Sequence, residues 1–178
     1  LKKENFVVGI SIDGPEELYS INRLRINGRR CYKEAVRGFQ LLKSYEIPCE
    51  ILCVVNPENV HYPIEVYSFF KQLGAQFITF LPLVEKQSSA GGANAERSVN
   101  DKAFGEFLCT IFDGWKENDI GTIKIQIFEE ALRTAFKQDH TLCIFKRTCG
   151  GVPVMEFNGD VYSCDHFVGK QNFLGNIR

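Results

Sequence analysis

The sequence lacks several features that would assign it to a specialised class of protein. No apolar run approaches the ~20 residues that cross a membrane, and residues 1–5 do not lead into the apolar core of a signal peptide. An excess of charge is also missing, because 21 basic residues face 22 acidic ones. Nucleic acids and acidic membranes bind basic surfaces. The sequence therefore predicts a cytoplasmic protein that binds neither nucleic acid nor membrane.

An initiator methionine is missing as well. The chain begins at Leu1, its single methionine is Met155, and it stops at Arg178 shortly after a turn-like Gly-Asn pair. We therefore expect a piece of a longer protein, with parts of any site lying in the rest. The 178 residues and 44% apolar content still suffice for one or two small domains with a real core.

Apolar runs and helical patterns alternate over the first three quarters of the chain. Continuous runs rich in β-branched residues predict strands buried on both faces, as in parallel sheets. Residues 16–30 are predicted to be a polar loop, and residues 85–98, rich in Ser, Ala and Gly, a mobile one. The resulting order is that of four β/α units with parallel strands. Strands are predicted at residues 6–12, 49–55, 76–81 and 122–127, and helices at residues 32–45, 61–73, 100–118 and 128–137.

The pattern changes after residue 138. Asn158-Gly159 stands between two short apolar segments at residues 152–157 and 160–163, and Asn-Gly in this position is the strongest short-range signal of a β-hairpin. We therefore predict an α/β body over residues 1–138, followed by a small antiparallel, cysteine-bearing module over residues 139–178.

The chain has seven cysteines. An odd number without a secretory signal argues against a framework of disulfides. Four of the seven lie among apolar neighbours, which predicts buried thiols that act as small apolar side chains. These four are Cys31, Cys49, Cys53 and Cys109.

The remaining three cysteines, Cys143, Cys149 and Cys164, form the pattern C-x5-C-x14-C. The predicted hairpin could bring Cys164 back toward Cys149, and three converging thiolates bind zinc or an iron–sulfur cluster. The pattern lacks the C-x2-C pair typical of structural zinc, so a metal site and unbound thiols both stay open. A fourth ligand would lie beyond the chain, with His140 and His166 as alternatives.

Two further places carry groups suited to chemistry. Asp165 directly follows Cys164. An Asp after a strand is most often a turn or cap residue, but in a partly closed pocket it could act as a general base.

The first predicted strand ends in Ser11-Ile12-Asp13-Gly14-Pro15, and parallel α/β folds bind ligands at the carboxyl ends of strands. There Ser11 offers a hydroxyl, and Arg23 could hold a carboxylate through two parallel hydrogen bonds. In isolation, Asp-Gly-Pro indicates a plain turn.

Six short stretches together carry a resemblance to a known family. They read VGISIDGPEEL at residues 8–18, FLPLVE at 80–85, FDGW at 112–115, CGG at 149–151, NGDVYSCDHFV at 158–168 and LGNI at 174–177. With these stretches the whole chain resembles the anaerobic sulfatase-maturating enzymes, which are radical S-adenosylmethionine (SAM) proteins with a SPASM-type auxiliary-cluster domain. The Asp-Gly-Pro strand end is shared by many radical SAM proteins. The Cys-Asp-His-Phe-Val run with the downstream Leu-Gly-Asn-Ile is much more specific.

The resemblance implies both a fold and a reaction. The fold would be a partial parallel (β/α) radical SAM barrel, here four β/α units, followed by the start of the SPASM-type module. Members of the family oxidise a Cys or Ser of a client sulfatase to formylglycine, using a deoxyadenosyl radical made when a reduced 4Fe-4S cluster cleaves SAM. A base takes the substrate proton, and an auxiliary cluster is thought to accept the remaining electron. The implied partners are the client sulfatase and a reductant such as flavodoxin or ferredoxin.

The resemblance also implies roles for single residues, and it shows what is missing. The Cys-x3-Cys-x2-Cys motif that holds the SAM cluster is absent from the chain, as are the strands expected to carry it, so we expect the fragment alone to be inactive. By resemblance, Asp165 matches the proposed base, Cys143, Cys149 and Cys164 match three ligands of the first auxiliary cluster, and Ser11, Arg23 and Leu83 match contacts to SAM.

Two alternatives stay open at this stage. Another SPASM radical SAM enzyme that modifies a different peptide would have the same barrel and differ only in its substrate-facing loops. A non-catalytic module whose cysteines hold zinc or an iron–sulfur cluster for structure or docking is the second alternative. Asp165 argues against it, because a purely structural zinc site does not need this acid.

Overall fold

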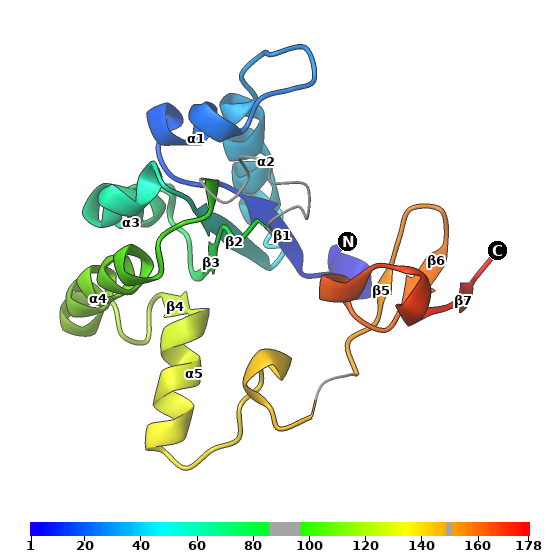
Figure 1. The fold of residues 1–178 in the computed structure, drawn as a ribbon. Coiled ribbons are helices and arrows are strands. Elements are labelled where there is room, and N and C mark those ends of the chain that lie inside the picture. Colours follow the sequence, from blue (N-terminus) through cyan, green and yellow to red (C-terminus); the bar gives the residue numbers. More distant parts are fainter. Residues whose placement is uncertain (86–96, 149–150) are drawn as a thin grey trace. The chain divides into compact units, whose positions relative to one another are not determined.

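The computed structural model describes residues 1–85, 97–148 and 151–178. The chain divides into two compact units, Leu1–Glu129 and Glu130–Arg178. The first unit contains a parallel sheet with helices, and the second contains a separate antiparallel sheet (Figure 1). The predicted α/β class is thus confirmed, together with the change from parallel to antiparallel strands. No helix within the described ranges has the length and apolar character needed to cross a membrane.

The first unit is built on a four-stranded sheet of order β1-β2-β3-β4, in which all neighbours are parallel. Helices connect strands that are adjacent in the sheet, as the alternating pattern predicted. The strands are β1 (Val8–Ser11), β2 (Cys49–Val55), β3 (Phe77–Pro82) and β4 (Lys124–Ile125). The helices are η1 (Lys2–Glu4), α1 (Glu16–Asn22), α2 (Tyr32–Ser44), η2 (Asn59–His61), α3 (Pro63–Leu73), α4 (Asp101–Asn118) and α5 (Gln126–Ala135).

The strand β2 buries one face, not two as its apolar run suggested. In β2, Ile51, Cys53 and Val55 are fully buried, while the residues between them are only half-buried. The helices α2, α3 and α4 lie along one side of the sheet (Figure 1), which accounts for this alternation. No residue of β1, an edge strand of the sheet, is buried. Burial of β1 on both faces was therefore a wrong prediction for the described chain.

Local sequence signals explain where α3 and α4 begin and end. Pro63 occupies the first turn of α3, where its missing N–H does no harm, and Gly74 ends the helix in the left-handed conformation with φ of 76°. Asn100 caps α4 by accepting a hydrogen bond from the Ala103 N–H at 3.1 Å. Both boundaries agree with the predicted helices.

Aromatic side chains join α3 and α4 through the sheet. The Phe80 ring on β3 lies 6.3 Å from the Phe70 ring of α3 and 5.4 Å from the Phe107 ring of α4. Phe107, Ile111 and Trp115 follow each other at four-residue steps on α4 and are all buried. The Trp115 Nε1 donates to the Ile123 carbonyl at 2.7 Å, which attaches the end of α4 to the approach to β4.

Three elements differ from their predictions. Residues 16–22 form α1 instead of a loop, with Pro15 at its N-cap position. The fourth strand is limited to two residues, and α5 begins at Gln126, because the alternation of residues 122–127 fits a strand and an amphipathic first turn equally well. The first strand starts at Val8, leaving Phe6 and Val7 exposed. The predicted mobile loop at residues 85–98 lies mostly outside the described residues.

The second unit carries a three-stranded antiparallel sheet of order β5-β6-β7. The predicted hairpin is confirmed: Gly159, with φ of 89°, turns the chain between β5 and β6 and donates to the Glu156 carbonyl at 2.9 Å. The strand β7 was not predicted as a strand. The elements are η4 (Cys143–Phe145), β5 (Val154–Met155), β6 (Asp160–Tyr162), η5 (Asp165–Phe167), η6 (Lys170–Asn172) and β7 (Phe173–Asn176).

Candidate functional site

The predicted ligand-binding residues of the first unit gather at the carboxyl edge of its sheet. Ser11 is the last residue of β1, is half-buried, and pairs with Leu52 of β2. Leu83 follows β3 directly and donates to the Val55 carbonyl at 2.8 Å. Because parallel strands end at the same edge, a hydroxyl and an apolar side chain lie on the side of the sheet where such folds bind ligands.

Arg23 reaches this edge through an ion pair with Asp13. The Arg23 Nε lies 2.5 Å from Asp13 Oδ2 and its Nη2 lies 3.1 Å from Oδ1. Asp13 is 3% exposed, whereas the Arg23 side chain is 29% exposed. Burial lowers the pKa of Arg23, but the hydrogen bonds and charge of Asp13 outweigh burial and raise the pKa above its ordinary value. The guanidinium therefore stays charged, with part of its surface open to solvent.

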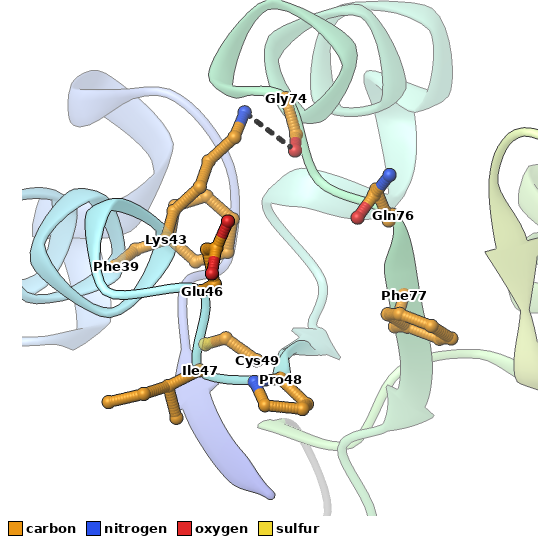
Figure 2. A pocket seen from close by; sticks show the side chains of 9 residues that line it. All are labelled: Phe39, Lys43, Glu46, Ile47, Pro48, Cys49, Gly74, Gln76 and Phe77. Atoms are coloured by element: carbon orange, nitrogen blue, oxygen red, sulfur yellow. Dashed lines mark hydrogen bonds between the residues drawn. The ribbon is translucent and has the colours of Figure 1, made fainter. Parts of the chain in front are cut away.

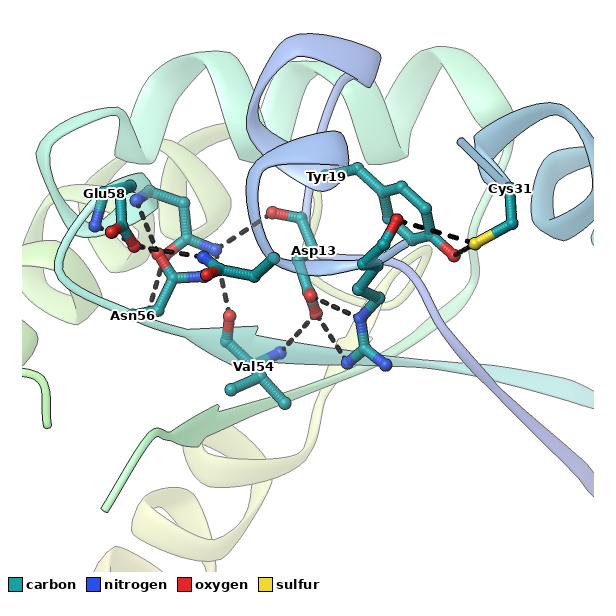
Figure 3. Close-up of polar contacts among 9 residues, drawn as sticks. Asp13, Tyr19, Cys31, Val54, Asn56 and Glu58 are labelled. Atoms are coloured by element: carbon teal, nitrogen blue, oxygen red, sulfur yellow. Dashed lines mark hydrogen bonds and ion pairs between the residues drawn. The ribbon is translucent and has the colours of Figure 1, made fainter. Parts of the chain in front are cut away.

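Asp13 is itself fixed to the end of β2. Its Oδ1 accepts a hydrogen bond from the Val54 N–H at 2.9 Å, and its carbonyl accepts one from the Asn59 Nδ2 at 3.0 Å. Figure 3 shows Asp13 between Val54 on one side and the Tyr19–Cys31 pair on the other. The tripeptide Asp-Gly-Pro is therefore more than a plain turn, because its acid is the centre of a buried polar network.

Sequence reasoning missed the two asparagines of this network. Asn59 is fully buried; it also donates to the Val54 carbonyl at 2.9 Å and accepts from the Asn56 N–H at 2.8 Å. Asn56, 2% exposed, accepts hydrogen bonds from the N–H groups of Glu58 and Asn59 at 3.0 Å each. The signal was available, since Asn at the end of a buried strand favours a side-chain-capped turn.

Cys31 and Tyr19 lie at the end of the network that is nearest to Arg23. The Tyr19 hydroxyl lies 3.7 Å from the Cys31 Sγ, which also lies 3.6 Å from the Arg23 carbonyl. Burial, together with the hydrogen bond to Cys31, raises the pKa of Tyr19 to about 12. The hydroxyl is therefore neutral at physiological pH, and it contacts the Arg23 backbone only through the Cys31 thiol, which donates to the Arg23 carbonyl.

The predicted base, Asp165, lies in the second unit on η5. Its Oδ1 is 3.6 Å from the Cys164 Sγ and accepts a hydrogen bond from the His166 N–H at 3.0 Å. Its Oδ2 takes no hydrogen bond from the described residues. The side chain is 64% exposed, so the described residues do not enclose it in the partly closed pocket that the sequence suggested.

The three predicted cluster ligands cannot be compared as a set. Cys143 and Cys164 are half-buried free thiols, and Cys149 lies outside the described residues. Within the described ranges no three His, Cys, Asp or Glu side chains come together as a metal site. Of the alternative ligands, His140 lies 3.0 Å from the Glu130 Oε2 through its Nδ1, and His166 is exposed. Ligation by these cysteines therefore stays a prediction.

Glu130 organises the segment that leads to Cys143. Its buried carboxylate receives the Thr141 N–H at 3.1 Å, the Thr141 hydroxyl and the ring of His140. Burial would raise the pKa of Glu130, but the hydrogen bonds from Thr141 and His140 outweigh burial and lower the pKa. The ionised carboxylate thus attaches the chain before η4 to the helix α5.

A pocket of about 380 Å³ opens at the opposite, amino-terminal end of the parallel sheet. Figure 2 shows Phe39, Cys49 and Phe77 around it, with the Lys43 Nζ donating to the Gly74 carbonyl at 3.1 Å. Burial raises the pKa of the Cys49 thiol to about 11, which makes it a poor nucleophile. This pocket holds none of the predicted site residues, which lie at the carboxyl edge of the sheet and in the second unit.

Comparisons with known proteins agree on one family. The chain is 39% identical, over 99% of its length, to the serine-type anaerobic sulfatase-maturating enzyme of Bacteroides thetaiotaomicron, of which it covers 46%. It is 31% identical, over 100% of its length, to the cysteine-type enzyme of Clostridium perfringens, of which it covers 48%. Over its whole length the chain is thus similar to the anaerobic sulfatase-maturating enzymes. It spans about half the length of the curated relatives that it matches. No protein-family model matches it.

Solved structures support the assignment to the sulfatase-maturating enzymes. A structure described as native anSMEcpe with bound AdoMet (that is, SAM) matches 99% of this chain with a TM-score of 0.84 and 31% identity, and 48% of that chain is covered. A second structure of that protein, with AdoMet and a peptide bound, matches 98% of this chain with a TM-score of 0.83. The resemblance seen in the sequence motifs is thus confirmed across both units.

Proposed function

We propose that the full-length protein is a radical SAM enzyme that oxidises a Cys or Ser of a client sulfatase to formylglycine. The observation that carries this proposal is the match of 99% of the chain, with a TM-score of 0.84, to a solved relative with AdoMet bound. The serine- and cysteine-type names of the relatives support a sulfatase as client. In this proposal the protein works with a reductant such as flavodoxin or ferredoxin, in the cytoplasm.

The parallel sheet belongs, in this proposal, to a partial radical SAM barrel. Four β/α units follow one another with neighbouring parallel strands, and the face of β2 that carries Glu50, Leu52 and Val54 is only half-buried. A barrel would turn that second face toward its interior. The first unit then supplies the carboxyl-edge half of the SAM site, and the second unit supplies the start of a SPASM-type module.

The residues at the carboxyl edge fit SAM chemically. The Ser11 hydroxyl makes no hydrogen bond with the described residues and suits a ribose hydroxyl. The partly exposed guanidinium of Arg23 suits the carboxylate of the methionine moiety, and the apolar Leu83 suits the adenine ring. Bound SAM, reduced by a 4Fe-4S cluster, would supply a deoxyadenosyl radical to remove a hydrogen atom from the substrate Cβ.

Asp165 is the proposed general base of the reaction. A carboxylate with one oxygen free of hydrogen bonds within the described chain can take the proton of the client thiol or hydroxyl. Loss of a hydrogen atom and a proton leaves one further electron to be removed. We propose that Cys143, Cys149 and Cys164 hold an auxiliary 4Fe-4S cluster, which is a one-electron acceptor. Contact between Cys164 and Asp165 would place proton and electron removal side by side.

The test uses the full-length protein under anaerobic conditions with SAM, a reductant and sulfatase peptides carrying Cys-x-Pro-x-Arg or its serine counterpart. The expected result is release of deoxyadenosine together with an aldehyde in one or both peptides, detected by mass spectrometry and hydrazide labelling. The 178-residue chain alone should give neither product. Deoxyadenosine without an aldehyde would favour a different peptide modification by a SPASM enzyme, and stoichiometric zinc without iron would favour a non-catalytic scaffold.

A further inference from the structure

The ion pair between Asp13 and Arg23 uses only one edge of the guanidinium group. A guanidinium has five N–H donors in a planar fork. Asp13 takes one donor from Nε and one from Nη2, at 2.5 Å and 3.1 Å. The remaining donors lie on Nη1 and on the other side of Nη2, and together they form a second edge that can also bind a carboxylate through two parallel hydrogen bonds.

The other contacts of Asp13 hold it in place independently of Arg23. Its Oδ1 is held by the Val54 N–H and its carbonyl by the buried Asn59, so both its side chain and its backbone are fixed to the end of β2. Arg23, in contrast, directly follows the last residue of α1 and begins a loop whose residues 24–30 are all exposed. The orientation of the guanidinium therefore depends on Asp13.

We infer that Asp13 is a positioning residue for SAM: it holds the Nε edge of Arg23 so that the Nη1–Nη2 edge faces the SAM carboxylate. This inference rests on the proposed function. Arg23 is a long, flexible side chain, and a free Arg would have to be ordered each time the ligand binds. Asp13 performs this ordering in advance, and its buried charge keeps the guanidinium in one orientation.

The experiment measures binding of SAM to the full-length protein with reconstituted clusters, by anaerobic equilibrium dialysis. Asp13→Asn keeps the size of the side chain but removes its charge and turns one acceptor into a donor that opposes Arg23. We expect SAM affinity to fall roughly 10- to 100-fold, the range expected for loss of an ordered, charge-assisted contact. Decarboxylated SAM, which lacks the carboxylate, should bind the variant and the wild type within about threefold.

A matched control comes from the same loop. Arg25 pairs with Glu34 at 2.7 Å, but both side chains are half exposed, and exposed ion pairs contribute little. Glu34→Gln should leave the affinity for SAM unchanged. Arg23→Lys removes the fork that Asp13 holds, so adding Asp13→Asn to Arg23→Lys should cause little further loss, because the two changes act on one contact.

The outcomes separate the inference from the proposed function. If Asp13→Asn lowers the affinity for SAM and for decarboxylated SAM equally, Asp13 has a purely structural role. If it changes neither affinity, Asp13 has no role in binding SAM. Either result overturns the inference but leaves the proposed function intact. Failure of the wild type to bind SAM would overturn the proposed function as well. If Asp13→Asn does not fold, Asp13→Glu, which keeps the charge but displaces the guanidinium, should show the same selective loss for SAM.

Discussion

Cys164 and Asp165 are adjacent in sequence and in contact, with the sulfur of one 3.6 Å from a carboxylate oxygen of the other. A thiol suited to bind iron and an acid suited to take a proton thus share one position at the start of η5. In the proposed reaction, which removes one proton and one electron from the same substrate intermediate, this contact would keep the two transfers close in space. The first two predictions separate the two roles.

Replacement of Asp165 by Asn should slow aldehyde formation about 100-fold or more while the fold persists. General bases typically contribute about 100-fold or more to the rate, and the exposed side chain of Asp165 makes few contacts whose loss would unfold the module. The measurement is aldehyde formed per minute in the full-length protein with a sulfatase peptide. Asp139→Asn, an exposed acid of the same unit without a hydrogen bond to the described residues, serves as the control. Full activity of Asp165→Asn would remove Asp165 from the mechanism.

Replacement of Cys143 or Cys164 by Ala should lower the metal content without affecting the parallel sheet. If these thiols ligate a 4Fe-4S cluster, each variant should lose roughly four iron atoms per protein, with a matching loss of acid-labile sulfide. Iron and sulfide are measured after anaerobic purification of the full-length protein. Cys109→Ala, which removes an exposed thiol from α4, should keep the wild-type content. Equal iron in all three variants would contradict cluster binding by Cys143 and Cys164.

Replacement of the buried Asn59 by Ala should destabilise the first unit. Three hydrogen bonds join Asn59 to the backbone of Asp13, Val54 and Asn56, and their loss leaves buried backbone groups without partners. The expected cost is about 3 kcal/mol, since each unsatisfied buried group costs about 1–3 kcal/mol. Urea denaturation of the wild type and the variant measures the difference in their free energies of unfolding. Asn118→Ala, which loses one exposed contact, should cost less than about 1 kcal/mol.

Glu130 should make the second unit sensitive to acid. Its pKa in the folded state is lowered, so the stability it provides is present above the unfolded-state pKa of about 4.3 and is lost as the pH falls through the lower, folded-state value. The difference in unfolding free energy between wild type and Glu130→Gln should be about 2 kcal/mol at neutral pH. The difference should shrink below about pH 4.

The neighbouring acid provides a control for this pH dependence. Glu129 lies on the same helix, and its side chain makes no hydrogen bond with the described residues. Glu129→Gln should therefore leave the acid sensitivity of the second unit unchanged. A constant difference between wild type and Glu130→Gln from pH 7 to about pH 3 would contradict the assigned role of Glu130.

The main strands and helices could be predicted because each has a strong local signal. The run from Cys49 to Val55 contains β-branched residues and ends at Asn56-Pro57, and the predicted bounds equal those of β2. The helix α1 was missed because its seven residues, Glu16–Asn22, are too few to show a clear apolar period. The strand β7 was missed because its pairing with β6 is a long-range contact that no short window of sequence reveals.

The candidate site was predictable in its residue types but not in its partners. The position of Ser11 at a strand end followed from the sequence, since strand ends can be located from apolar runs. The pairing of Arg23 with Asp13 joins residues ten positions apart across a helix, α1, that was not predicted. The sequence suggested Arg23 as a ligand for a substrate carboxylate, and the structure adds that one of its two edges already holds a carboxylate of the protein.

Anchoring of Arg23 through Asp13 has a consequence for the loop that follows it. Residues 24–30 form a small antiparallel turn, closed by the Leu24–Arg30 bridge, and its tip residue Ile26 is fully exposed. Because Arg23 takes its orientation from the sheet through Asp13, the turn is free to lengthen, shorten or change its chemistry without displacing the guanidinium. In the proposed enzyme, changes in the length or chemistry of this turn should therefore leave the guanidinium in place to bind the SAM carboxylate.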